Sequence, residues 1–240
     1  EMCIRDSKVT GKIHFLDGQG NANAQNHFIQ TSSTTPSNGV KRYMVLDTTE
    51  YKDFMQEEVP AGEGAMAAIL ALDAAVIEEV TADIDGVWIA NYNCPGQIVI
   101  TGAADAVGEA GDACKEAGAK RVVPLKVSGP FHSALLAEAG KKLGEALEDV
   151  TIQPITIPYL TNVTADYVKD PADVKDYLVR QVSSSVRWQQ TIERLIADGA
   201  EEFVEIGPGR SLSGFMRKIN RDVTTCNIDK MEDFNKYVNR

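Results

Sequence analysis

Apolar and polar positions follow two different periods between residue 65 and residue 127. Short apolar runs bounded by turn residues predict strands, and longer segments with apolar residues three or four apart predict helices. The strands are expected at 65–70, 87–92, 97–101 and 121–127, and the helices at 73–84, capped by Asp73, and at 103–117. The order strand, helix, strand, strand, helix, strand is that of a ferredoxin-like βαββαβ unit.

Helices and strands alternate again after residue 133. Helices are predicted at 134–147, 173–182, 188–199 and 210–219, an extended segment at 156–163, and a strand at 202–206. This alternation predicts a parallel sheet covered by helices, and therefore an α/β fold. Residues 1–50 have little periodicity, and we expect loops or disorder there except at the strand-like runs 12–16 and 42–46. Residues 2–7 are interpreted as a fusion or sequencing scar.

The composition excludes several classes of protein. The 240 residues are 43% hydrophobic and 25% charged, which is typical of a soluble globular protein. The net charge of −11 argues against binding to nucleic acid or to anionic membranes. No apolar run approaches the roughly 18 residues of a membrane span, and no signal peptide is visible. The four cysteines form no Cys-x-x-Cys pair, which favours a cytoplasmic protein without a zinc site.

His132 is the strongest candidate for chemistry. It lies in Val-Ser-Gly-Pro-Phe-His-Ser (127–133), between a predicted strand and a predicted helix, and the other histidines are His14 and His27. A histidine held by backbone on both sides is suited to act as a general base. The alternative for a lone histidine is a capping or surface role, which the neighbouring segments disfavour.

Each of two further segments can be interpreted either as part of a functional site or as an ordinary structural feature. Gln181 falls at a helix end, where carbonyl groups lack intrahelical partners and can fix the tautomer of an imidazole. The turn after Glu205, Gly207-Pro208-Gly209, can cradle an anion at a helix start. The alternatives are an ordinary helix end and an ordinary link between a strand and a helix.

Taken together, several segments resemble the malonyl-CoA:acyl carrier protein transacylase family, which includes the acyltransferase domains of fatty-acid and polyketide synthases. The resemblance extends from about residue 54 to about residue 220, with the segments in family order. They are 54–68 (FMQEEVPAGEGAMAA), 91–102 (NYNCPGQIVITG), 127–133 (VSGPFHS), 162–164 (NVT), 179–181 (VRQ) with Trp188, and 205–209 (EIGPG).

The resemblance implies a ping-pong acyl transfer in fatty-acid biosynthesis. A serine takes the malonyl group from malonyl-CoA as an ester, and the phosphopantetheine thiol of acyl carrier protein then removes it. His132 matches the base, Gln181 matches the residue whose carbonyl holds the histidine, and Asn91 and Asn93 match a stretch that borders the coenzyme channel. The family needs no metal or other cofactor, so the expected partners are acyl carrier protein and the coenzyme A thioester.

The resemblance also defines the expected domains. Residues 1–53 form an atypical N-terminal segment, residues 54–128 a ferredoxin-like small subdomain with its lead-in, and residues 129–240 the C-terminal part of the α/β acyltransferase subdomain. The expected fold class is α/β, with an incomplete α/β-hydrolase-like layer beside the βαββαβ subdomain. We expect the small subdomain to be stable and the N-terminal segment to be less ordered.

The chain departs from the family pattern at its nucleophile. No Gly-x-Ser-x-Gly elbow occurs in the sequence. Tyr51 stands four residues before Met55, where the family has its malonate-binding arginine, and a phenol cannot grip a carboxylate bidentately. Gln19 in Gly-Gln-Gly (18–20) matches the oxyanion-hole glutamine but lies too close to Met55. We expect a family member whose N-terminal part is lost, replaced or mis-joined, with impaired activity; a diverged non-catalytic relative is the other explanation.

Two alternatives to an acyltransferase remain. One is a non-catalytic module, or an inactive fragment, that binds acyl carrier protein. A basic cluster suits an acidic carrier protein and is equally consistent with a solvated helix face: Arg210, Arg217, Lys218 and Arg221. The other is a cysteine-based acyltransferase using Cys94, which is disfavoured because the turn around it has no basic neighbour in sequence.

Overall fold

The computed structural model describes residues 9–10, 27–31, 42–46, 59, 62–127, 129–207 and 209–239. The strands are β1 (Val9–Thr10), β2 (His27–Thr31), β3 (Arg42–Leu46), β4 (Gly64–Leu70), β5 (Val87–Cys94), β6 (Gln97–Ala103), β7 (Arg121–Pro124), β8 (Thr151–Ile152), β9 (Glu202–Ile206) and β10 (Thr224–Ile228). The α-helices are α2 (Ala74–Ala82), α3 (Ala104–Glu116), α4 (Ala137–Ala146), α5 (Val174–Ser183), α6 (Trp188–Ala197), α7 (Ser211–Ile219) and α8 (Met231–Val238). Two short 3₁₀ helices, η1 (Ala134–Leu136) and η2 (Pro171–Asp173), lead into α4 and α5.

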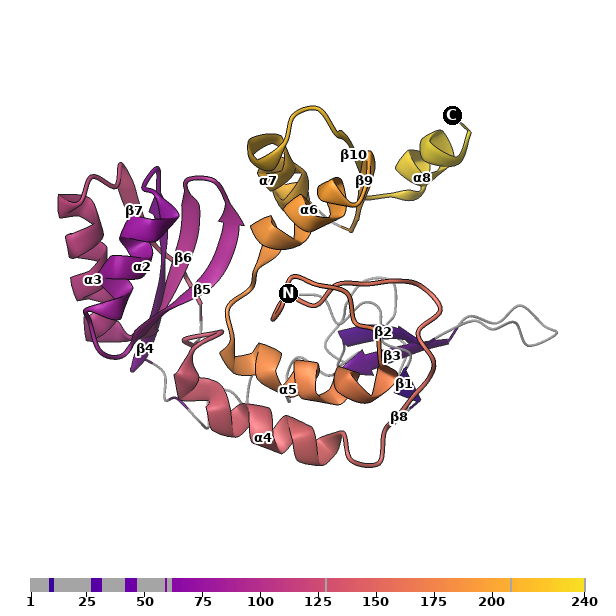
Figure 1. Cartoon of the computed structure of the whole chain (residues 1–240), viewed down its shortest axis with the longest axis horizontal. Coiled ribbons are helices and arrows are strands. Elements are labelled where there is room, and N and C mark those ends of the chain that lie inside the picture. The colour runs from indigo at the N-terminus through magenta and orange to yellow at the C-terminus, as the bar shows by residue number, and fades with distance from the viewer. Residues whose placement is uncertain are drawn as a thin grey trace.

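A four-stranded antiparallel sheet forms one end of the molecule, and α2 and α3 cover one of its faces (Figure 1). The strand order is β5-β6-β4-β7, and β4 pairs with β6 on one side and β7 on the other. The elements follow in the predicted order, with small differences in bounds: β7 ends at Pro124 instead of continuing to Val127. The predicted cap of α2 is present, because the Asp73 carboxylate accepts a hydrogen bond from the backbone N–H of Ala75.

Strand β4 is buried on both of its faces. Ala67 and Ile69 point into the core beneath α2 and α3, where small and β-branched side chains allow close packing. Met66 and Ala68 point to the opposite face, where they pack with Ala90 and Val99. The partly buried ring of Phe131 also contacts this second group, so the segment before His132 rests on the sheet.

Helices α4 and α5 lie side by side below the sheet (Figure 1). Their contact is close because α4 carries Gly140, where an added Cβ would lie 2.9 Å from the carbonyl oxygen of Val179 on α5. The cluster Leu136, Ala139 and Val182 fills the space next to this contact, together with Val59. The predicted helices 134–147 and 173–182 correspond to η1 with α4 and to η2 with α5.

The C-terminal part contains the parallel strand pair β9–β10, with α6 and α7 beside it (Figure 1). The predicted helices 188–199 and 210–219 correspond to α6 and α7, and the predicted strand 202–206 is β9. Strand β10 and helix α8 were not expected from the sequence. The predicted extended segment 156–163 is no regular strand; Leu160 forms an isolated antiparallel bridge with Tyr167.

Two short strand pairs are separate from the four-stranded sheet. Strand β2 pairs with β3, and β1 pairs with β8, both antiparallel. The strand-like run 42–46 coincides with β3, whereas the expectation of loop or disorder is wrong for 9–10 and for 27–31. The run 12–16, residues 2–7, Gln19, Tyr51 and Met55 lie outside the described residues.

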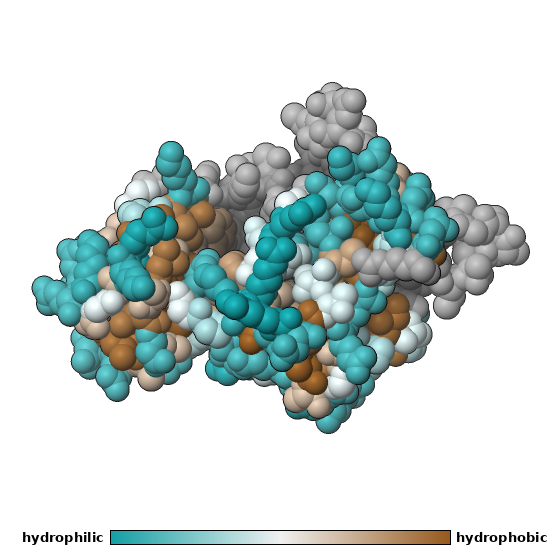
Figure 2. Space-filling view, turned by 90° about the horizontal axis from the view of Figure 1, so that it is seen from above, coloured by the Kyte–Doolittle hydropathy of each residue, from teal (hydrophilic) through white to brown (hydrophobic). Residues whose placement is uncertain are grey.

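Hydrophilic residues cover most of the face seen in Figure 2, with separate hydrophobic patches between them. In the C-terminal part, the large apolar side chains of Ile206, Met231, Phe234 and Val238 are 44–69% exposed. Among the described residues, no helix is both long and apolar enough to cross a membrane.

Candidate active site

His132 lies on a tight turn that the surrounding structure holds from several sides. Its φ angle of 61° is in the left-handed region, which costs a non-glycine residue free energy. The hydroxyl of buried Ser133 donates a 2.7 Å hydrogen bond to the carbonyl oxygen of Pro130, which closes the turn around Phe131 and His132. Phe131 itself packs between the outer face of the sheet and the α4–α5 cluster. The turn therefore joins the sheet to the helix pair.

The imidazole of His132 meets the end of α5. Its Nδ1 atom lies 3.0 Å from the carbonyl oxygen of Gln181. Because a carbonyl oxygen only accepts hydrogen bonds, Nδ1 carries the proton in this pair. In the neutral ring, Nε2 then keeps its lone pair and is able to take a proton from another group.

The surroundings of His132 favour its neutral form. Burial lowers the pKa of the imidazole below its ordinary value of 6.5, while hydrogen bonds with the backbone of Gln181 and of Ser184 oppose that shift. A neutral imidazole at neutral pH is the form that a general base requires.

The carbonyl of Gln181 is available because α5 ends two residues later, at Ser183. The chain then runs back to the sheet: the N–H of Val186 donates to Ala90 at 2.7 Å, and the N–H of Tyr92 donates to Val186 at 2.9 Å. The hydroxyl of Ser185 also donates to the carbonyl of Ile89. These bonds fasten the end of α5 to β5.

Asn91 and Asn93 lie on β5, near its junction with the segment that follows α5. Asn91 forms an isolated parallel bridge with Val186, at an irregularity in the pairing of β5 with β6. Both side chains are half-buried. The structure thus brings His132 and Gln181 into contact and places Asn91 beside the segment that follows Gln181. Gln19, the expected oxyanion residue, lies outside the described residues.

Ser133, Ser184 and Ser185 support the site but were not expected from the sequence. Ser133 bonds to Pro130 within the turn, whereas Ser184 and Ser185 contact His132 and Ile89, which are far away in the sequence. A serine beside a turn or a helix end gives only a weak local signal.

Cys94 has a basic neighbour that the sequence did not reveal. Lys218 lies close enough for its charge to lower the pKa of the thiol, but burial has the larger effect and raises that pKa overall. The Lys218 ammonium donates instead to the side-chain oxygen of Gln97. A buried thiol with a raised pKa is a poor nucleophile, so the geometry disfavours cysteine catalysis.

The turn after β9 already has an anion at the helix start. The Glu205 carboxylate accepts hydrogen bonds from the N–H groups of Leu212 and Ser213 at 3.1 and 2.9 Å, and from the Ser213 hydroxyl. The N-terminus of α7 is therefore satisfied by the chain's own carboxylate, which favours the linking interpretation of this turn over an open anion cradle.

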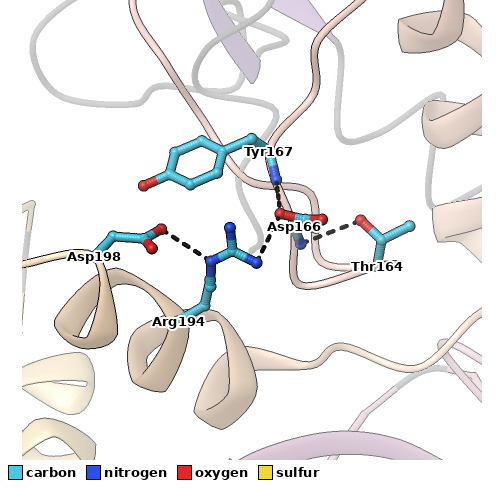
Figure 3. A network of polar contacts seen from close by, with 5 residues as sticks. All are labelled: Thr164, Asp166, Tyr167, Arg194 and Asp198. Carbon is cyan, nitrogen blue, oxygen red and sulfur yellow. Dashed lines mark hydrogen bonds and ion pairs between the residues drawn. The ribbon is translucent and has the colours of Figure 1, made fainter.

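A polar network connects helix α6 to the loop that precedes α5 (Figure 3). Arg194 contacts Asp198 at 2.9 Å and Asp166 at 3.3 Å, and its guanidinium lies 5.7 Å from the centre of the Tyr167 ring. The hydrogen bond from Arg194 lowers the pKa of Asp198. Because the arginine bridges two carboxylates from separate segments, we interpret the network as a structural clamp. Within the described part of the chain, no group of three or more His, Cys, Asp or Glu residues could hold a metal ion.

Known proteins are similar to this chain over most of its length. The sequence profile of the acyl transferase domain matches residues 44–228. A malonyl CoA-acyl carrier protein transacylase of Bacillus subtilis is 48% identical over 184 residues, which cover 75% of this chain and 58% of that protein. The Escherichia coli K12 protein of the same name is 42% identical over 180 residues, covering 74% and 58%.

Solved structures show the same relationship. The crystal structure of an acyl carrier protein S-malonyltransferase from Vibrio cholerae is 39% identical, with a TM-score of 0.75 over 77% of this chain and 61% of that one. A malonyl-transacylase in complex with a type II polyketide synthase acyl carrier protein is 37% identical, with a TM-score of 0.76 over 80% and 63%. The chain spans about 58% of the length of the curated relatives it matches. With the profile covering more than half of its residues, the chain belongs to the acyl transferase domain family.

Proposed function

We propose that this chain carries the histidine half of a malonyl-CoA:acyl carrier protein S-malonyltransferase site. The single observation that supports this most is the 3.0 Å contact between Nδ1 of His132 and the carbonyl oxygen of Gln181. It leaves Nε2 free as a base and fixes the ring without a carboxylate. The names of the relatives supply the substrate class, malonyl-CoA and acyl carrier protein.

In the proposed reaction, Nε2 of His132 takes the proton of a serine hydroxyl as its oxygen attacks the malonyl thioester carbonyl. The carbon–sulfur bond breaks, coenzyme A leaves as the thiol after receiving the proton, and malonyl-serine remains. The carrier-protein thiol then gives its proton to the same Nε2 and attacks the ester, whose carbon–oxygen bond breaks as the serine oxygen takes the proton back. Each half-reaction returns the imidazole to its neutral form, so no cofactor is consumed.

We further propose that the 240 residues alone transfer malonate poorly, because they contain no Gly-x-Ser-x-Gly elbow. In subtilisin, another enzyme in which a histidine activates a serine, loss of the serine costs about 10⁶ in kcat. Asn91 and Asn93 would border the bound coenzyme, and Gln19 remains an oxyanion candidate by resemblance only.

Mass spectrometry after incubation with malonyl-CoA tests this proposal. We expect the mass of the chain to stay unchanged while a full-length relative from Bacillus subtilis is labelled under the same conditions. A malonyl adduct mapped to one serine or cysteine of this chain would reveal a nucleophile within it and contradict the expected impairment.

A second candidate function, carrier-protein binding without chemistry, is favoured by a basic hollow on α7 and β10. The hollow has a volume of about 540 Å³, and its lining includes Arg217, Lys218 and Arg221. Acidic partners are attracted to such a surface even though the whole chain has a net charge of −11.

Binding of acyl carrier protein, measured by titration at two salt concentrations, tests the second candidate. We expect Arg217→Glu to weaken binding at least tenfold at low salt, and Lys115→Glu, on the distant helix α3, to leave it nearly unchanged. Equal affinities for the two variants would remove the hollow from the proposal.

We also propose the finer description of the fold and its domains. The order β5-β6-β4-β7 with two helices on one face supports a ferredoxin-like small subdomain over residues 54–128. The parallel pair β9–β10 supports an incomplete α/β-hydrolase-like layer within residues 129–240, after an atypical segment over residues 1–53. A cytoplasmic location agrees with Cys94 and Cys114, which are buried thiols that form no disulfide.

A further inference from the structure

Gly64 and Pro130 meet at the base of the turn that carries His132. Gly64 begins β4, and Pro130 is fully buried. A Cβ atom added to Gly64 would lie 2.6 Å from Cγ and 2.9 Å from Cβ of Pro130, and closer still to Cδ. Real Cβ atoms essentially never lie within 3.0 Å of a heavy atom to which they are not linked through the chain. The absence of a side chain at residue 64 is therefore what lets Pro130 rest on the sheet.

The proline ring cannot turn away from such a clash. Its Cδ atom is bonded to the backbone nitrogen, and the ring fixes φ, so a side chain at residue 64 must displace the backbone of Pro130 itself. A flexible side chain in the same place would move at little cost. The contact thus transmits any change at Gly64 directly to the chain two residues before His132.

Pro130 also stabilises the turn through its carbonyl group. Its carbonyl oxygen accepts the 2.7 Å hydrogen bond from the Ser133 hydroxyl, so Pro130 and Ser133 enclose Phe131 and His132. The φ angle of 61° at His132 is retained only where the surroundings fix it. A displaced Pro130 removes one of these constraints and allows the imidazole to leave the carbonyl of Gln181.

We propose that Gly64 is a positioning residue for His132: its bare backbone seats Pro130 and thereby sets the contact of Nδ1 with Gln181. The importance of this contact for catalysis rests on the proposed function, in which His132 is the base. The contact itself does not depend on any nucleophile, and its test does not require activity.

Nitrogen-15 spectra of the histidine rings in the whole 240-residue chain provide the test. They distinguish the Nδ1–H from the Nε2–H tautomer, and the loss of one signal in His132→Asn assigns the ring. We expect Gly64→Ala to shift His132 from mainly Nδ1–H toward the Nε2–H form and to raise its pKa toward the ordinary 6.5, since the ring leaves its buried place.

Gly108→Ala is the matched control. Gly108 lies on the exposed face of α3, and an added Cβ there meets nothing within 4 Å. We expect this variant to keep the tautomer and the pKa of His132. Pro130→Ala combined with Gly64→Ala removes Cγ and Cδ, and should restore part of the Nδ1–H population that Gly64→Ala loses.

An unchanged tautomer and pKa in folded Gly64→Ala would overturn the proposal. If Gly64→Ala does not fold, the single variant Pro130→Ala tests the proposal, because it removes the proline ring from its place against Gly64 without adding a clash. We expect a reduced Nδ1–H population of His132 in this variant. An Nδ1–H population equal to that of the wild-type chain would overturn the proposal. A malonyl adduct on the wild-type chain would contradict the expected impairment under the proposed function only, because the tautomer of His132 is measured without any nucleophile.

Discussion

His132 combines a buried imidazole with a backbone acceptor, and this combination makes the stability of the fold depend on pH. Burial lowers the pKa of the folded state below 6.5, whereas the unfolded chain keeps the ordinary value. Between the folded pKa and 6.5 the unfolded chain binds more protons, so the free energy of unfolding rises with pH there and levels off above 6.5.

We therefore expect the wild-type chain to lose stability as the pH falls through this window, by about 1.4 kcal/mol for each unit of pKa difference. His132→Asn, which tolerates a positive φ angle, should lose less over the same range. Urea unfolding at pH 7.5 and pH 5 gives both values. His14 and His27 are present in both chains, so the difference between their losses of stability reports on His132 alone. Equal losses in the wild-type chain and in His132→Asn would contradict the expected pKa shift.

At the residue scale, the sequence predicts the contact between His132 and Gln181 better than the residues that support it. His132 and Gln181 are 49 residues apart, and their contact followed from a turn, a helix end and a resemblance. The contact of Gly64 with Pro130 and the charge of Lys218 near Cys94 depend on how distant segments pack. No local pattern encodes such contacts, which explains why they were not predicted.

At the element scale, the crossing of α4 and α5 depends on a single glycine. A Cβ on Gly140 would lie 2.9 Å from the Val179 carbonyl oxygen, whereas one on Gly144 would lie 3.2 Å from a Val179 methyl group. A side chain can rotate away more easily than a backbone can move. We expect Gly140→Ala to destabilise the chain by about 1–3 kcal/mol, and Gly144→Ala to be nearly neutral because the helix gains about 1 kcal/mol.

Thermal or urea unfolding of the two alanine variants compares them directly. Gly140→Ala should also disturb the Nδ1–H signal of His132, since Val179 precedes Gln181 by two residues on α5. Equal stabilities for the two variants would mean that the helix pair is loose enough to absorb the extra methyl group.

Strand β9 and helix α7 are joined through Glu205. Its carboxylate accepts hydrogen bonds from two backbone N–H groups and one hydroxyl at the start of α7. An amide in its place offers only one oxygen as an acceptor. We expect Glu205→Gln to cost about 1–3 kcal/mol of stability, and Glu201→Gln, at an exposed position just before β9, to cost less than about 0.5 kcal/mol. Chemical unfolding measures both, and equal losses would argue against the cap.

The elements themselves were largely predictable where the periodicity is strong. The order of β4 to β7 with α2 and α3 followed from alternating apolar positions and from turn residues such as Pro95-Gly96. Strand β10 and helix α8 were missed. Strand β10 carries several polar residues (Thr224–Ile228), and α8 buries none of its side chains among the described residues, so neither has the apolar pattern of a core element.

At the scale of the whole molecule, the distribution of buried residues predicts unequal local stability. The cluster beneath α2 and α3 contains eleven buried residues, and β4 makes seven residue pairs with β6. Strands β9 and β10 form a two-stranded parallel pair, an arrangement that is rarely stable without further strands. Helix α8 exposes Met231, Phe234 and Val238 and has no buried residue.

Amide hydrogen exchange of the folded chain should therefore have three different rates in three parts of the molecule. We expect the slowest exchange in β4 and β6, faster exchange in β9 and β10, and the fastest in α8, because local opening costs least where the fewest apolar side chains are buried. The N–H of Val186, which bonds to Ala90, reports whether the end of α5 opens with the sheet or separately. Protection of α8 equal to that of β4 would show that the apolar face of α8 is covered in solution, and would refute this ordering.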